Sequence, residues 1–133
     1  MRLFIFIFLF CFPQISIAEV FQVKGDTLFY NMEYTYGKQP IKLGHDDQLL
    51  KVLEKNKNIK SLKLESSGGN TEVAKRMANI IIDAQLDTHV DKLCSSSCVR
   101  LFLAGNTRTA NLGAQIGHCQ TNLTRKRLIL NSG

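Results

Sequence analysis

Two short segments of this chain carry residue types that can perform acyl-transfer chemistry. The first contains Gly68-Gly69, between an alternating stretch and an amphipathic one. Two consecutive glycines leave backbone N–H groups unshielded, and at the positive start of a helix such groups can stabilise an oxyanion. A plain turn also explains a glycine pair, so this pair alone assigns no function.

The second segment, Cys94-Ser95-Ser96-Ser97-Cys98, offers hydroxyl groups at the start of the next predicted helix. A serine needs a base to become a nucleophile, and serines also cap helices without any catalytic role. The chain has three histidines. His45 is expected on the surface of a loop and His89 as a packed or edge residue of a strand. His118 is the candidate base, because it ends a predicted strand within reach of the serines.

The cysteines allow two interpretations. Cys94 and Cys98 can form a disulfide only if Cys94 precedes the helix, because Cβ atoms four residues apart on a helix lie about 5–6 Å apart. Closing this loop contributes about 2 kcal/mol at most and mainly holds the turn that carries Ser96. The alternative is a zinc site that adds His118 and Cys119. Adjacent strand residues point to opposite faces, which disfavours that ligand set, and we expect no metal or other cofactor.

The elements that position these segments alternate between strand and helix. Strands are predicted at 21–23, 27–30, 61–65, 88–90, 107–110 and 114–118, and helices from Asp46 or Asp47 to about 55, from Asn70 or Thr71 to 84, and at 99–104. This order predicts an α/β domain with parallel strands. Both segments then follow the carboxyl end of a strand, where ligands bind in open α/β sheets.

Residues 1–18 are predicted to be a cleaved signal peptide. A basic residue precedes an apolar run over 3–12, and Ser16-Ile17-Ala18 supplies small residues for a signal peptidase. The run spans about 15 Å as a helix, too short for a bilayer core of about 30 Å, so no stable membrane span is expected after cleavage. The alternatives are a short anchor and a lipoprotein signal at Cys11, which the bulky Phe10 disfavours. We expect an exported protein, periplasmic or secreted.

Residues 19–133 are expected to form a single domain. The chain has 133 residues, 44% of them hydrophobic and 21% charged, which excludes a disordered polyelectrolyte and a multi-span membrane protein. Its net charge of +6 comes mostly from scattered residues with no basic stripe interleaved with aromatics, so nucleic acid is not an expected partner. Outside the signal the cysteines are odd in number, so at least one is free, pairs between chains or binds something.

Four segments, taken in order, resemble exported ClpP-like serine peptidases of the ClpP/crotonase superfamily. They are Leu62–Asn70 with the helix that follows, Cys94–Cys98, Phe102–Gly105 and Gly113–Gly117. The resemblance covers about residues 62–120. It implies an α/β fold of the ClpP/crotonase type, a spiral of strand–helix units. It also implies that the domain is incomplete at its carboxyl end, since residues 121–133 cannot supply the remaining elements.

The resemblance implies roles for individual residues. Gly68 and Gly69 match the glycines whose amides stabilise the oxyanion in that family, and Ser96 matches the nucleophile between two cysteines. The position of the family's histidine is Cys119, and His118 lies one residue before it. Since a shift of one residue on a strand reverses the side chain, either His118 reaches the serine through a local bulge or the base has been lost. No acidic residue follows His118 in this sequence.

Two functions from different classes follow from these residues. In the first, an exported hydrolase cuts a peptide or protein substrate: Ser96 attacks the carbonyl, His118 takes the proton, and the amides of Gly68 and Gly69 hold the oxyanion. Activity should be weak, because losing the orienting acid costs a triad about 10⁴ in rate. In the second, a catalytically silent relative binds peptides or assembles, for example as a homo-oligomer. A third hypothesis gives Cys119 a thiol role beside His118.

Overall fold

Strands and helices alternate along the residues that the structure, a computed structural model, describes, namely 20–31 and 40–117. In chain order the elements are β1 (Phe21–Lys24), β2 (Thr27–Asn31), α1 (His45–Lys55), β3 (Ser61–Ser66), α2 (Thr71–Asp83), β4 (Asp87–Ser95), α3 (Cys98–Leu103), β5 (Arg108–Ala110) and β6 (Gln115–Gly117). The predicted alternation of strand and helix is confirmed, and the chain has the predicted α/β class.

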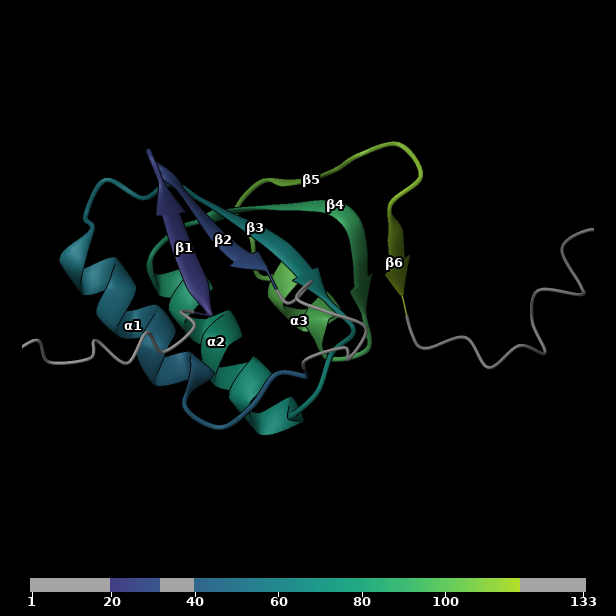
Figure 1. Ribbon diagram of the computed structural model, residues 1–133, viewed down its shortest axis with the longest axis horizontal. Helices are drawn as coiled ribbons and strands as arrows, with labels where there is room; N and C mark the ends of the chain where they lie inside the picture. Colours follow the sequence, from purple (N-terminus) through teal and green to yellow (C-terminus); the bar gives the residue numbers. More distant parts are fainter. Residues whose placement is uncertain (1–19, 32–39, 118–133) are drawn as a thin grey trace, which may run out of the picture.

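The strands form one sheet in the order β1-β2-β3-β4-β5, and β6 pairs with the carboxyl-terminal part of β4. β1 and β2 form an antiparallel hairpin, whereas every other pair is parallel. Figure 1 shows α1, α2 and α3 below the sheet, on the same side of it. The carboxyl ends of β3 and β4 therefore lie side by side, and the loops that follow them lie at one edge of the sheet.

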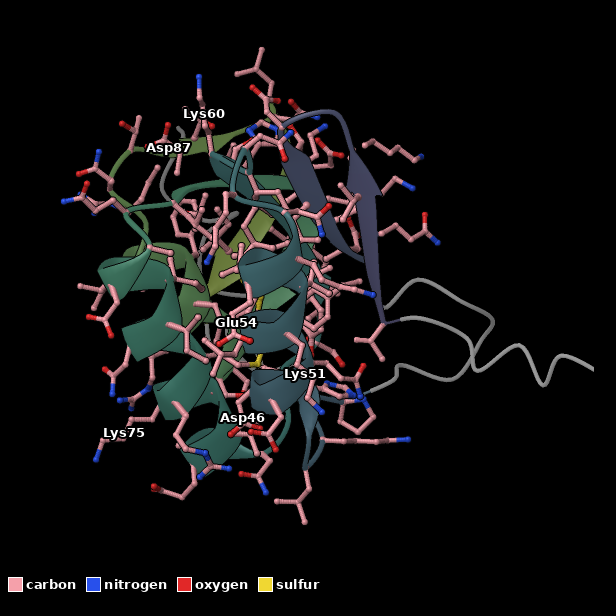
Figure 2. The ribbon with its side chains drawn as sticks, turned by 90° about the vertical axis from the view of Figure 1, so that its left-hand side faces the viewer. Asp46, Lys51, Glu54, Lys60, Lys75 and Asp87 are labelled. Atoms are coloured by element: carbon pink, nitrogen blue, oxygen red, sulfur yellow. A yellow bond between two sulfur atoms is a disulfide. The ribbon has the colours of Figure 1, made fainter. Side chains whose placement is uncertain are left out.

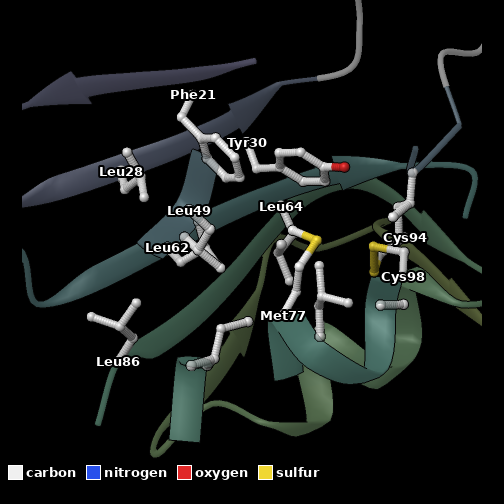
Figure 3. Close-up of a cluster of buried hydrophobic side chains, with 14 of the residues drawn as sticks. Phe21, Leu28, Tyr30, Leu49, Leu62, Leu64, Met77, Leu86, Cys94 and Cys98 are labelled. Carbon is white, nitrogen blue, oxygen red and sulfur yellow. A yellow bond between two sulfur atoms is a disulfide. The ribbon is translucent and has the colours of Figure 1, made fainter. Parts of the chain in front are cut away.

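The buried core lies between the sheet and the helices (Figure 3). In β3, Leu62 and Leu64 are fully buried on the face toward the helices, as the alternation of the sequence predicts. On α2, Val73, Met77 and Ile81 form the matching apolar stripe. Each such side chain stabilises the fold by about 1.5–3 kcal/mol relative to an exposed position. This packing holds β3 and α2 rigidly on either side of the glycine loop.

The two longer helices begin differently. The Oδ1 atom of Asn70 accepts a hydrogen bond from the Val73 N–H at 3.0 Å, so the predicted cap of α2 is confirmed. In α1 the residue before the helix is Gly44, with φ of 89°, and not Asp46 or Asp47 as predicted. Those two carboxylates lie in the first turn instead, where they interact favourably with the positive helix end.

β4 is much longer than the predicted strand at 88–90. It runs from Asp87 to Ser95, and its pairing with β3 shifts register between Leu64 and Ser66. Asp91 does not end the strand, because it lies on the same face as His89, which no helix of the described residues covers. The additional residues carry β4 to the serine turn.

Figure 2 shows α1 and α2 lying next to each other, with Lys51 and Glu54 on α1 and Lys75 on α2. The Nε atom of Arg76, on α2, donates a hydrogen bond to Asp46 Oδ2 at the start of α1. Burial alone would raise the pKa of Asp46, but the hydrogen bond and charge of Arg76 outweigh it and lower that pKa. Among helices within residues 40–117, none is long and apolar enough to cross a membrane.

His45 is buried, which corrects the prediction that it lies on the surface. It is 5% exposed, and its Nδ1 atom lies 2.8 Å from the Tyr30 hydroxyl and 3.3 Å from the Lys42 N–H. The Lys42 N–H can only donate, so Nδ1 is the acceptor, Tyr30 donates to it, and the neutral ring carries its proton on Nε2. Burial raises the pKa of Tyr30, so its hydroxyl stays protonated. The pair links β2 to the start of α1.

The stability of the fold should fall in mildly acidic solution because of His45. Burial and the nearby Lys42 lower the pKa of His45 from 6.5, although Asp46 opposes them. Below about pH 6.5 the unfolded chain therefore binds a proton that the folded chain resists, and stability drops by up to about 1.4 kcal/mol per pH unit until the folded-state pKa is passed. Urea denaturation between pH 7.5 and 5 measures this. His45→Gln should flatten the curve. Equal slopes in the two proteins would contradict the assignment, since both retain His89 and His118.

Candidate functional site

Two turns meet at the carboxyl ends of β3 and β4. The glycines follow β3 and precede α2, while Ser96 lies between β4 and α3. Ser66 is paired with Cys94 across the two strands, so the turns begin at the same level of the sheet. The predicted equivalence of the two loops is therefore present in the structure.

Gly68 lies directly against the serine turn. It is buried, and a Cβ atom on it would stand 2.8 Å from both the Ser95 carbonyl oxygen and the Ser96 Cβ, and 3.1 Å from the Ser97 nitrogen. Real Cβ atoms essentially never approach other atoms as closely as 2.8 Å. Only glycine allows this approach. The Gly68-Gly69 loop therefore lies against Ser96, the nucleophile expected from the sequence.

The serines on either side of Ser96 hold the two turns together. Ser95 donates its hydroxyl to the Ser67 carbonyl at 3.1 Å, and Ser97 donates to the Gly69 carbonyl, also at 3.1 Å. Ser96 is exposed, and its hydroxyl makes no hydrogen bond to any residue that the structure describes. Among the described residues, the flanking hydroxyls therefore have structural partners and the central one has none.

The backbone at Ser96 is in the left-handed region, with φ of 55°. Residues other than glycine occupy this region uncommonly, and such positions cost about 1–3 kcal/mol. The Ser96 N–H donates to the Gly117 carbonyl at 2.9 Å, which ties the turn to the end of β6. His118, the predicted base, and Cys119 come next in the chain and lie outside the described residues.

Gly69 is held by the segment that precedes α1. The Ile41 N–H donates to the Gly68 carbonyl at 2.7 Å, and the Asn70 N–H donates to the Ile41 carbonyl at 2.8 Å. A side chain on Gly69 would overlap Ile41 and Pro40. These bonds leave the Gly69 N–H without an acceptor among residues 40–117, whereas the Gly68 N–H donates to Ser66 Oγ at 3.1 Å.

A disulfide joins Cys94 and Cys98 across the serine turn, as one of the two interpretations predicted, and both residues are fully buried. Cys94 is still part of β4 and Cys98 begins α3, so the bond spans the junction between strand and helix. The bond uses the thiols of Cys94 and Cys98, which are two of the four ligands of the alternative zinc site. Within the described residues no three potential metal ligands cluster.

The sequence did not point to the roles of Ser66, Ser95 and Ser97. Each bonds a backbone group of the glycine loop, and the repeated serines of both segments were the only available signal. Ile41, which forms a bridge with Gly69, lies between the strand predicted at 27–30 and the helix predicted from Asp46 or Asp47, where no regular element is predicted. Its contact brings together residues 28 positions apart, which local patterns do not report.

Solved structures with a similar fold include enoyl-CoA hydratases and a ClpP chain. An enoyl-CoA hydratase from Mycobacterium smegmatis has 11% sequence identity and a TM-score of 0.53, and the match covers 74% of this chain and 48% of that one. A hydratase from Shewanella pealeana has 13% identity and a TM-score of 0.50, covering 72% and 47%. A ClpP variant from Listeria monocytogenes has 19% identity and a TM-score of 0.51, covering 79% and 63%.

These likenesses establish the ClpP/crotonase type of fold that the resemblance implied. At 11–19% identity they carry the fold and not the activity. This chain spans about half the length of the two hydratases and 63% of the ClpP chain. No protein-family model matches the chain, and no curated protein matches it.

Gly68→Ala should destabilise the protein far more than Gly25→Ala. Both glycines have positive φ, 100° and 63°, so each alanine incurs the left-handed penalty of about 1–2 kcal/mol. Only at Gly68 does the new methyl meet the serine turn, while nothing lies within 4 Å at Gly25. The steric clash should add about 1–3 kcal/mol. Urea denaturation of both variants measures the difference, and equal losses would mean that the contact between the turns is absent in solution.

Proposed function

We propose that this protein is an exported serine-peptidase-like hydrolase with Ser96 as its nucleophile. The observation that carries the proposal is the exposed Ser96 hydroxyl, which lies in a left-handed turn packed against Gly68. Both flanking serines are engaged elsewhere, so the turn presents one hydroxyl. Residues 1–18 would direct export, and a disulfide fits an oxidising compartment.

In the proposed reaction Ser96 Oγ attacks the carbonyl carbon of a peptide bond. The hydroxyl proton passes to His118, the new C–O bond forms, and the carbonyl oxygen becomes an oxyanion. When the oxyanion collapses, the C–N bond breaks and His118 returns the proton to the departing amine, leaving an acyl-enzyme. Water, activated by His118, then releases the acid and restores Ser96.

The oxyanion would be held by backbone amides of the glycine loop. The Gly69 N–H is the better donor, since no described residue accepts from it. The Gly68 N–H donates to Ser66 Oγ and would have to share or leave that bond. A single such donor contributes about 2.7–4 kcal/mol to the transition state. Loss of the Gly69 donor alone would therefore slow the reaction by 10²–10³.

The end of β6 supports the choice of His118 as the base. The Ser96 N–H donates to the Gly117 carbonyl at 2.9 Å, so the last described residue of β6 is tied to the serine turn. His118 is the next residue in the chain.

The second candidate is a catalytically silent protein that binds peptides or assembles with copies of itself. One observation favours it: the Gly68 N–H donates to Ser66 Oγ, so one of the two amides expected to hold the oxyanion is already engaged. The two candidates differ in covalent reactivity at Ser96. A folded protein that binds peptides but never acylates at this serine belongs to the second class.

A fluorophosphonate probe should label Ser96 in the purified protein. Ser96→Ala should abolish labelling, because the probe reacts with an activated serine hydroxyl. Ser97→Ala is the matched control: it removes a neighbouring hydroxyl of the same turn and one bond to the glycine loop, and it should retain labelling at a reduced rate. Intact-mass spectrometry measures the added mass. A sample that shows a cooperative thermal transition but no labelling would contradict the hydrolase proposal and favour the catalytically silent protein.

The two residues after Gly117 should respond differently to substitution. His118→Ala should slow labelling of Ser96 by about 10²–10⁴, the usual contribution of a general base. Cys119→Ala changes the next residue along the chain, and the two side chains are similar in size. This substitution should change the rate of Ser96 labelling less than threefold. The rates of probe incorporation decide between them. A larger effect at Cys119 than at His118 would transfer the role to the thiol and contradict the assigned base.

A further inference from the structure

The sheet face opposite the helices carries a row of polar side chains. Cross-strand register aligns Phe29, Lys63, His89 and Thr109 on four neighbouring strands. Lys63 Nζ lies 5.4 Å from the centre of the Phe29 ring at one end of the row. At the other end His89 and Thr109 face each other across β4 and β5. None of these residues takes part in the site at the serine turn.

His89 connects a hydroxyl to a carboxylate. Its Nδ1 atom lies 2.7 Å from Thr109 Oγ1, and its Nε2 atom lies 2.9 Å from Asp91 Oδ1. Asp91 is two residues along β4 and therefore on the same face. The three groups form a continuous chain of two short hydrogen bonds.

The direction of this chain follows from the state of Asp91. Burial alone would raise the pKa of Asp91, but the hydrogen bonds and charges of Lys63 and His89 outweigh it and lower that pKa, so the group is ionised. An ionised carboxylate only accepts hydrogen bonds, so His89 Nε2 carries the proton. In the neutral ring Nδ1 is then an acceptor, and the Thr109 hydroxyl donates to it.

Two further groups hold Asp91 in place. Lys63 Nζ lies 3.3 Å from Oδ2, and Asn111 Nδ2 donates to Oδ1 at 3.1 Å. The carboxylate is therefore fixed from β3 and from the segment after β5. A fixed carboxylate keeps the His89 ring in one orientation and one tautomer, which is the role of the acid in a catalytic triad.

We propose that Thr109 is a second nucleophilic hydroxyl, activated by His89 and Asp91, that accepts acyl groups from small activated esters or thioesters. Thr109 is exposed, and His89 is 23% exposed, so a small reagent can reach the pair from solvent. Oγ1 attacks the carbonyl carbon and its proton moves to His89 Nδ1. The bond to the leaving alkoxide or thiolate breaks, His89 returns the proton to it, and Thr109 is left as an acyl ester.

The open sheet face limits this chemistry to reactive acyl donors. Thr109 lies within strand β5 and not at a glycine loop or at the start of a helix, and an amide bond needs oxyanion stabilisation more than an aryl ester does. The site is separate from the serine turn, because His89 precedes Ser95 by six residues, about 20 Å along an extended strand. This inference does not depend on the function proposed for Ser96.

The test measures acetylation by p-nitrophenyl acetate in a Ser96→Ala background, with Cys119 alkylated beforehand. Trypsin cuts after Arg108, so Thr109 and the nearby exposed Thr107 fall in different peptides, and fragment-ion spectra distinguish Thr109 from Thr121 and Thr124 in the second peptide. Thr109 should be acetylated at least tenfold faster than Thr107. His89→Gln should reduce the acetylation rate of Thr109 to that of Thr107, since glutamine can form a hydrogen bond with the hydroxyl but accepts no proton from it. Thr109→Val should remove the added mass from its peptide.

Equal rates at Thr109 and Thr107 would overturn the proposal, and so would an unchanged rate in His89→Gln. A thermal melt of each variant shows whether it folds. Asp91→Asn is a second probe, because asparagine keeps the size of the side chain and should slow Thr109 at least threefold without abolishing the reaction. Since Ser96 is absent throughout, failure here leaves the hydrolase proposal untouched, and failure of fluorophosphonate labelling leaves this one untouched.

Discussion

The contact between Gly68 and the serine turn is the constraint on which the candidate site depends. Because position 68 has no side chain, the two loops approach until backbone meets backbone, and the hydroxyls of Ser95 and Ser97 then reach the carbonyls of the glycine loop. The disulfide between Cys94 and Cys98 closes the same turn from within. A side chain at position 68 would push the two loops apart and weaken the bonds from Ser95 and Ser97, which would loosen the position of Ser96.

The fold by itself does not choose the chemistry. Hydratase and ClpP chains share this arrangement of sheet and helices at TM-scores of 0.50–0.53, so the likeness carries the fold and assigns no activity to this chain. What differs from protein to protein is the set of side chains and amides at the loops that follow the strands. In this chain those loops present a serine hydroxyl and a glycine amide, which is why a hydrolase is the better proposal.

The two faces of the sheet are chemically distinct. The face toward the helices is mainly apolar and closed, with Leu62 and Leu64 fully buried. The opposite face carries charged and polar residues that bond one another across strands, with Asp91 at the centre. An uncovered face lets a strand alternate strictly between apolar and polar residues, and this alternation made β3 easy to predict. The polar residues Asp91 and Lys92 also made β4 hard to predict, because the predicted strand ended before Asp91.

The sequence by itself determined the α/β class, the two strands of the hairpin, the strand β3 and the cap of α2 at Asn70. Hydrophobic periodicity and capping act between residues close in the chain. It also singled out the glycine pair and the serine turn. Only the tertiary structure decided that these loops touch, that His45 is buried against Tyr30, and that His89 joins Thr109 to Asp91. Each of these contacts joins separate elements, and their geometry comes from the packing and register of the whole sheet.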